Sequence, residues 1–133
     1  MANRISHVTL YVHDQDEAAA FYTEKMGFKK LFDEPMSEDL RWVTVGLPGD
    51  SVELVFEPLA WRADDAEFVR RATDIIGYQE LLLHVDDCHA LCAELQERGI
   101  PAELTEEPWG IQATVRDLYG NMITLIQPPQ MDA

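Results

Sequence analysis

Hydrophobic and polar positions along the chain predict the same series of elements twice. The run HVTLYVHD, from His7 to Asp14, alternates like a strand and is followed by QDEAAAFYTEKMGF, whose apolar positions recur at helical spacing. ELLLHVDD, from Glu80 to Asp87, and CHALCAELQERGI repeat that order. Each strand ends in an acidic residue suited to cap the helix that follows. The pattern therefore predicts two copies of one structural module.

Both predicted helices have recognisable ends. Asp14 and Glu17 stand at capping-box spacing before the first helix, and Gly27 follows its last apolar residue. The second helix is predicted to stop at Gly99. Its apolar face is made by four residues at helical spacing: Cys88, Leu91, Cys92 and Leu95. The favoured interpretation of the two cysteines is buried thiols in a reducing compartment.

Three more strand-like segments follow each helix. They are FKKLFDE, RWVTVGL and DSVELVFEP after the first helix, and IPAELTE, IQATVRDL and GNMITLIQPP after the second. Each module therefore reads β-α-β-β-β, which predicts an α+β fold in a single domain, residues 1–133. Module one covers residues 1–58 and module two residues 79–133. The connection, residues 59–78, has apolar residues at helical spacing and is predicted to form a short helix over one end of the sheet.

Strand alternation sorts the side chains onto two faces. One face of each sheet is apolar and is predicted to pack on the helix, as with Leu10 and Leu54. The opposite, mixed faces are predicted to carry His7, Thr9, Tyr11, Glu53, Val55, Glu57, Glu80, Leu82, His84, Met122, Thr124 and Ile126. Two curved sheets set side by side would make a cup lined by these residues. Glu57 lies near a strand end, where we expect a solvated side chain.

Charge narrows the choice of partners. The chain has 25 acidic and 10 basic residues, a net charge of −15, which disfavours nucleic acids and anionic membranes as partners. No apolar run approaches the roughly 20 residues that span a bilayer. The start, MANRISHVTL, lacks the layout of a signal peptide. We therefore expect a cytoplasmic protein without nucleic-acid or membrane partners.

Three stretches carry a resemblance to a known family. ISHVTLYVHDQDEAAAFYTEKMGF, DSVELVFEP and PWGIQATVRDLYGNMITLIQP resemble the vicinal-oxygen-chelate superfamily, the glyoxalase/bleomycin resistance protein/dioxygenase group. The resemblance covers essentially the whole chain. It implies two βαβββ modules that form a curved mixed sheet around a cup-shaped site. It also implies a homodimer.

Catalytic members of that family bind a divalent metal through ligands on the first and fourth strands of each module. Carried over by position, His7 and Glu53 match the expected ligands. Glu80 stands where the family has a histidine, and Thr124 where it has a glutamate. The resemblance thus implies His7, Glu53 and Glu80 as ligands of Mn, Fe, Ni, Zn or Mg, with Glu80 alternatively the catalytic base. A threonine hydroxyl is a poor ligand, and Thr124 would instead bond substrate.

Three interpretations of the polar residues stay open. The first is the reduced metal site just described. The second is a metal-free polar pocket in which the same residues bind an organic ligand. The third is structural, with the carboxylates paired to one of three arginines: Arg4, Arg41 or Arg116. The aromatic residues Tyr11, Trp42 and Trp109 would stack on a flat or apolar ligand, or else fill the space between modules.

The sequence therefore predicts a protein that binds a small organic molecule in the cup. Metal-assisted lyase or isomerase chemistry, as in glyoxalases, or dioxygenase chemistry would accompany binding in the enzymatic interpretation. The alternative is a non-catalytic, metal-free protein that sequesters a drug or a toxic metabolite. An acidic cup would suit a cationic ligand in that second interpretation.

Overall fold

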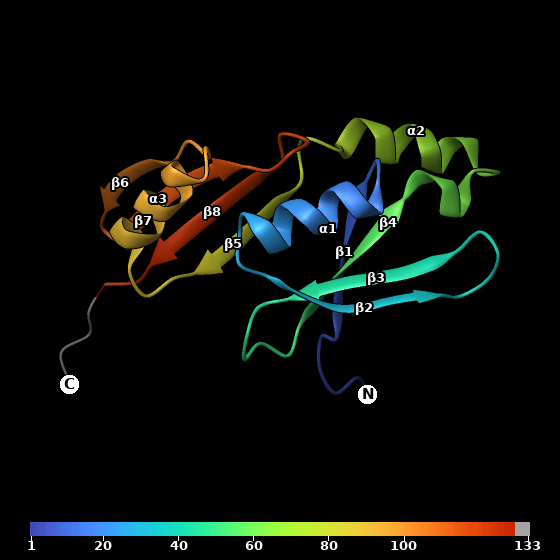
Figure 1. Ribbon diagram of the computed structural model, residues 1–133, viewed down its shortest axis with the longest axis horizontal. Helices are drawn as coiled ribbons and strands as arrows, with labels where there is room; N and C mark the ends of the chain where they lie inside the picture. Colours follow the sequence, from blue (N-terminus) through green and yellow to red (C-terminus); the bar gives the residue numbers. More distant parts are fainter. Residues whose placement is uncertain (130–133) are drawn as a thin grey trace. The chain divides into compact units, whose positions relative to one another are not determined.

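The computed structural model describes residues 1–129, and in it each predicted module forms a four-stranded mixed sheet (Figure 1). The elements of the first module are β1 (His7–Val12), α1 (Gln15–Glu24), β2 (Lys29–Pro35), β3 (Arg41–Gly46) and β4 (Glu53–Pro58). Those of the second are β5 (Glu80–His84), α3 (Cys88–Glu97), β6 (Glu103–Glu107), β7 (Gly110–Arg116) and β8 (Met122–Gln127). The predicted β-α-β-β-β order is confirmed in both.

The two sheets share one topology. The strand order is β1-β4-β3-β2 in the first sheet and β5-β8-β7-β6 in the second. The first and last strands of each module run parallel, and the other neighbours are antiparallel. The helix after the first strand lies against the same sheet, as Figure 1 shows for α1 and α3. The first strand of each module is therefore an edge strand beside the last.

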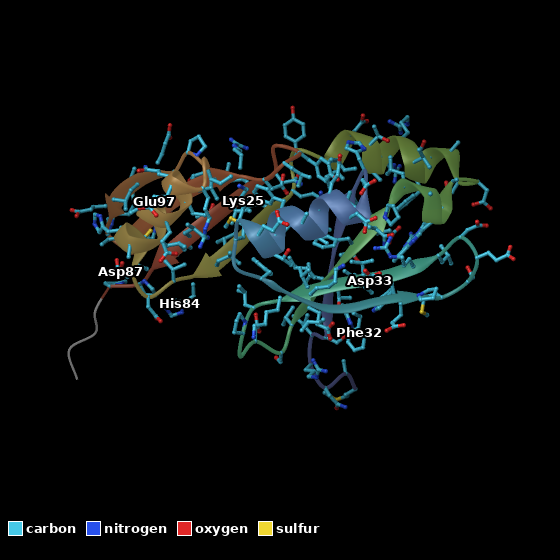
Figure 2. All side chains as sticks on the ribbon, in the orientation of Figure 1. Lys25, Phe32, Asp33, His84, Asp87 and Glu97 are labelled. Atoms are coloured by element: carbon cyan, nitrogen blue, oxygen red, sulfur yellow. The ribbon has the colours of Figure 1, made fainter. Side chains whose placement is uncertain are left out.

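The helices begin where the sequence predicted. The Asp14 side chain accepts a hydrogen bond from the backbone N–H of Glu17 at 2.9 Å. Asp87, labelled in Figure 2, accepts from the N–H of Ala90 at 3.0 Å. Each carboxylate satisfies one of the N–H groups that a first helical turn leaves unpaired. The paired acidic residues at the strand ends are thus helix caps.

Each module has its own core between helix and sheet. In the first, the buried Tyr22 of α1 lies edge-on to Phe28, with ring centres 5.4 Å apart, and contacts Phe56 at 5.7 Å. In the second, α3 buries Cys88, Cys92 and Leu95, as predicted. Burial raises the pKa of Cys88 to about 11, which keeps that thiol protonated and unreactive. Remaining buried apolar strand residues include Leu10, Val12, Val43, Val45, Leu54, Ala113, Val115, Ile123 and Leu125.

The connection between the modules contains two helices. The predicted amphipathic helix is α2 (Ala66–Ile75). A 3₁₀ turn precedes it, η1 (Leu59–Arg62), which the sequence pattern did not predict. The chain divides into a unit that ends at Ile76 and a unit that begins at Gly77, so η1 and α2 belong with module one. Within residues 1–129 no helix has the length and apolar character of a membrane span.

One predicted exposure is wrong. Glu57 was expected to be solvated, but only 4% of it is exposed. The chain leaves β4 directly into η1, and Arg62 of that turn contacts the Glu57 carboxylate. Strand alternation correctly placed Glu57 on the mixed face, but a local pattern does not show which later segment covers the end of a strand.

Candidate functional site

The strand pair β1–β4 brings the first two predicted site residues together. His7 and Glu53 are direct neighbours in the parallel register. The Nε2 atom of His7 lies 3.8 Å from Oε2 of Glu53. The other oxygen, Oε1, accepts a 2.7 Å hydrogen bond from the hydroxyl of Thr44, which is fully buried in β3. Thr44 therefore orients the Glu53 carboxylate, leaving Oε2 beside the imidazole.

Two tryptophans lie on the same side of this pair. The indole of Trp42, on β3, meets the His7 ring edge-on with centres 5.6 Å apart. Trp61, from η1, stacks on Trp42 with centres 5.9 Å apart and planes only 8° from parallel. The sequence prediction included Trp42 but missed Trp61. The available signal was its position, three residues after the EP pair that ends β4.

Tyr11 belongs to the other end of β1. Its register neighbour is Glu57, and its ring meets Phe68 of α2 edge-on at 5.6 Å. Four residues of strand, about 13 Å, separate Tyr11 from His7. The mixed face of module one thus carries two groups of side chains: His7, Glu53, Trp42 and Trp61 at one end, and a second group around Glu57 at the other.

Module two repeats this arrangement with a shifted register. Glu80 is opposite Met122, and the residue opposite Thr124 is Leu82, which is 63% exposed. Thr124 still donates a 3.4 Å hydrogen bond to Oε1 of Glu80. The position that corresponds to His7 by strand register is therefore an apolar leucine. Positional alignment of the sequence had placed Glu80 there.

Trp109 lies directly before β7. Just over half of it is exposed, at 54%, and its Nε1 donates to Oε1 of Gln112 at 3.0 Å. This bond fixes the edge of the indole within module two and leaves its apolar surface accessible. A role in ligand binding stays a prediction.

The three arginines of the structural interpretation have other partners. Arg41 pairs with Asp16 of α1 and Asp33 of β2 (Asp33 is labelled in Figure 2). Arg41, together with Lys30, lowers the pKa of Asp33 to about 2. Arg4 donates to the carbonyl of Ser51, and Arg116 to that of Gly120.

The site carboxylates consequently have no ion pair with an arginine among residues 1–129. Glu53 has an imidazole and a hydroxyl as its contacts, and Glu80 a hydroxyl. In the described part of the chain, no three His, Cys, Asp or Glu side chains gather as a metal-binding group. The geometry thus provides one carboxylate–imidazole pair beside a stacked indole pair.

Comparison with known proteins places this arrangement in a family context. The model of the Glyoxalase/Bleomycin resistance protein/Dioxygenase superfamily matches residues 4–125. The structure of UcmS2 is 37% identical and superposes with a TM-score of 0.83, covering 95% of this chain and 98% of that one. TnmS3, described as an antibiotic binding protein from Streptomyces sp. CB03234, is 35% identical with a TM-score of 0.78 over 96% and 97% of the two chains.

The chain is also similar in sequence to a protein that is named as an enzyme. A probable lactoylglutathione lyase of Vibrio cholerae is 30% identical over 142 residues, covering 98% of this chain and 95% of its own. Similar chains thus carry two kinds of description, an antibiotic-binding protein and a probable lyase.

Proposed function

The chain belongs to the glyoxalase/bleomycin resistance protein/dioxygenase superfamily, and from that premise we propose that it binds a flat small organic molecule on the mixed face of module one. The observation that carries the proposal is the near-parallel stack of Trp42 and Trp61. Indoles provide large, rigid apolar surface, and ring stacking contributes about 0.5–1.5 kcal/mol beyond the area buried. The antibiotic-binding description of TnmS3 supports the same class of function.

The polar pair supplies orientation next to that surface. His7 lies edge-on to Trp42 and its Nε2 is near Glu53 Oε2, so a donor or acceptor on the ligand would find a partner beside the ring that it stacks on. Few, well-placed polar groups at an aromatic surface are typical of small-molecule sites. We propose binding without chemical conversion, which corresponds to a protein that sequesters its ligand.

We predict that Trp42→Ala weakens ligand binding by about 30-fold, because truncated tryptophans at binding hot spots commonly cost about 2 kcal/mol. The probes are bleomycin and a panel of planar aromatic antibiotics, titrated by calorimetry with tryptophan fluorescence as a second signal. Trp42→Phe is the matched variant, since it keeps an aromatic face and should retain most of the affinity. Equal affinities for the parent protein and Trp42→Ala would contradict the proposal.

A second candidate is metal-assisted catalysis, favoured by the 3.8 Å separation of His7 Nε2 and Glu53 Oε2. Nitrogen and oxygen ligands lie about 2.0–2.2 Å from a bound ion, so two ligand atoms of one ion lie roughly 3–4 Å from each other. The separation of His7 Nε2 and Glu53 Oε2 therefore fits two positions of one coordination sphere. His7 and Glu53 would hold the ion. A bound ion would act as a Lewis acid on a chelated substrate, as lyase or dioxygenase chemistry requires.

Elemental analysis separates the two candidates. After incubation with Mn, Fe, Ni, Zn or Mg and desalting, we expect metal well below one ion per chain, because His7 and Glu53 form a two-ligand pair and no third His, Cys, Asp or Glu joins them within residues 1–129. Near-stoichiometric metal in the parent, lost in Glu53→Gln alone, would instead support the catalytic candidate.

The assembly and location of the protein stay predictions. We propose a homodimer on the basis of the resemblance to the family. We propose a cytoplasmic location because the sequence is acidic and contains no long apolar run. Light scattering on the purified chain measures the first of these directly.

A further inference from the structure

The second group on the mixed face of module one centres on a buried carboxylate. Glu57 lies on β4 with 4% of its surface exposed. Its ion-pair partner is Arg62, whose Nε lies 3.1 Å from Oε2, while Nη2 donates a long 3.4 Å hydrogen bond to Oε1. A buried carboxylate is costly unless it is paired and hydrogen-bonded. The arginine of η1 therefore neutralises a charge that β4 buries.

The pairing leaves part of the carboxylate unsatisfied. Within residues 1–129, Oε2 of Glu57 has no hydrogen-bond partner, since Arg62 Nε approaches it at ion-pair distance without the alignment of a hydrogen bond. Buried polar atoms in proteins are nearly always hydrogen-bonded, and an exception asks for an explanation. Burial also raises the pKa of Glu57, with Arg62 acting in the opposite direction. This carboxylate has capacity for a better-aligned donor.

The guanidinium also contacts an aromatic ring. The Arg62 carbon Cζ lies 4.4 Å from the centre of the Phe68 ring. Phe68 meets Tyr11 edge-on, and Tyr11 is the register neighbour of Glu57. A carboxylate combined with an aromatic face binds planar cations by charge-assisted hydrogen bonds and cation–π attraction. Glu57 and Phe68, which contact the guanidinium, together with the adjoining Tyr11, therefore have the chemistry of a cation receptor.

Arg62 is half-exposed and belongs to a short element. Its side chain is 54% exposed, and it comes from the single turn η1. An incoming ligand would thus meet a half-exposed arginine and a carboxylate oxygen that lacks a donor.

We propose that Tyr11, Glu57 and Phe68 form a receptor for a planar organic cation, an amidinium or guanidinium group, whose place Arg62 occupies in the absence of ligand. The inference deepens the proposed function and rests on it: the flat molecule that stacks on Trp42 and Trp61 would carry this cationic group. The ligand class is therefore a planar aromatic molecule with an amidine or guanidine substituent. The guanidinium of Arg62 would move into solvent when the ligand binds.

An internal competitor has a measurable consequence. Apparent affinity falls in proportion to the fraction of molecules in which the site is free. Removing the Arg62 side chain should therefore tighten cation binding, whereas removing Glu57 should weaken it. A purely structural Glu57–Arg62 ion pair predicts no gain of affinity from either change.

The experiment titrates the full chain with benzamidinium and with its neutral isostere benzamide, by calorimetry. We expect Arg62→Ala to bind benzamidinium about tenfold more tightly than the parent, with benzamide unchanged. Glu57→Gln should abolish the preference for the cation. The matched control is Arg70→Ala, which removes an exposed arginine of α2 paired with Glu67 and Asp74 and should behave as the parent.

If Arg62→Ala unfolds, Arg62→Met is the second variant, because it keeps an apolar side chain over Phe68. Circular dichroism verifies the fold of each protein. Unchanged benzamidinium affinity in a folded Arg62 variant would overturn the inference, as would an equal gain for benzamide. Suppose that neutral planar ligands bind in a Trp42-dependent way, but the protein binds benzamidinium no more tightly than benzamide. That result would refute the cation receptor alone and leave the proposed function standing. Absence of any Trp42-dependent binding would refute the proposed function instead.

Discussion

Gly110→Ala is expected to lower the free energy of unfolding by about 3 kcal/mol, the combined scale of an overpacked contact and a strained backbone. Gly110 begins β7 with φ at +129°, a conformation that side chains rarely tolerate. A Cβ built on it would stand 2.1 Å from the carbonyl oxygen of Gln127 on β8. That neighbour is backbone in a paired strand and cannot move aside cheaply.

Gly120→Ala is the matched control for this prediction. Gly120 also has a positive φ, +86°, but a Cβ there would meet nothing within 4 Å. Its cost should be conformational strain alone, about 1 kcal/mol. Urea unfolding of the two variants and the parent measures the difference. Equal losses of stability would show that the β7–β8 contact is not the reason for a glycine at position 110.

Asn121→Ala is expected to lower the free energy of unfolding by about 3 kcal/mol. The substitution leaves buried hydrogen-bonding groups without a partner, and each such loss costs about 1–3 kcal/mol. Asn121 is 1% exposed. Its Oδ1 accepts from the backbone N–H of Gly77 at 2.7 Å and of Gln79 at 3.0 Å, and its Nδ2 donates to Asp117 at 2.9 Å. The side chain thus fastens the segment that leads into β5.

The chain's other asparagine provides the control. Asn3 is exposed, and Asn3→Ala should change the free energy of unfolding by less than about 0.5 kcal/mol. Amide hydrogen exchange adds a local measurement, since the N–H groups of Gly77 and Gln79 should exchange faster in Asn121→Ala. Unaltered exchange at both amides would mean that Asn121 is not their acceptor in solution.

Local pattern was sufficient for much of the fold. Alternation and helical spacing are set by backbone geometry within a few residues, so the doubled strand–helix pattern correctly predicted both β-α-β-β-β modules. The caps Asp14 and Asp87 act within one turn and were predicted for the same reason. The resemblance also predicted correctly that His7 and Glu53 are close together, because neighbours on parallel strands follow from the repeated topology.

The parts of the candidate site that depend on distant segments were not accessible in this way. Trp61 was missed because its stack on Trp42 depends on how η1 folds back after β4. The burial of Glu57 has the same origin, since Arg62 covers it from that turn. The register of β5 against β8 was also not accessible from the local pattern, because cross-strand pairing decides it and places Leu82 opposite Thr124.

The sequence by itself therefore determined the two modules, their helix caps and the carboxylate–imidazole pair, since each depends on short-range periodicity or on a topology that it repeats. Only the tertiary structure decided the indole stack, the buried carboxylate with its arginine, and the shifted register of module two. These features arise where η1 and α2 contact residues of the first sheet and where β5 pairs with β8. Each of these segments has a local pattern that is compatible with other arrangements, so only the contacts between them decide the outcome.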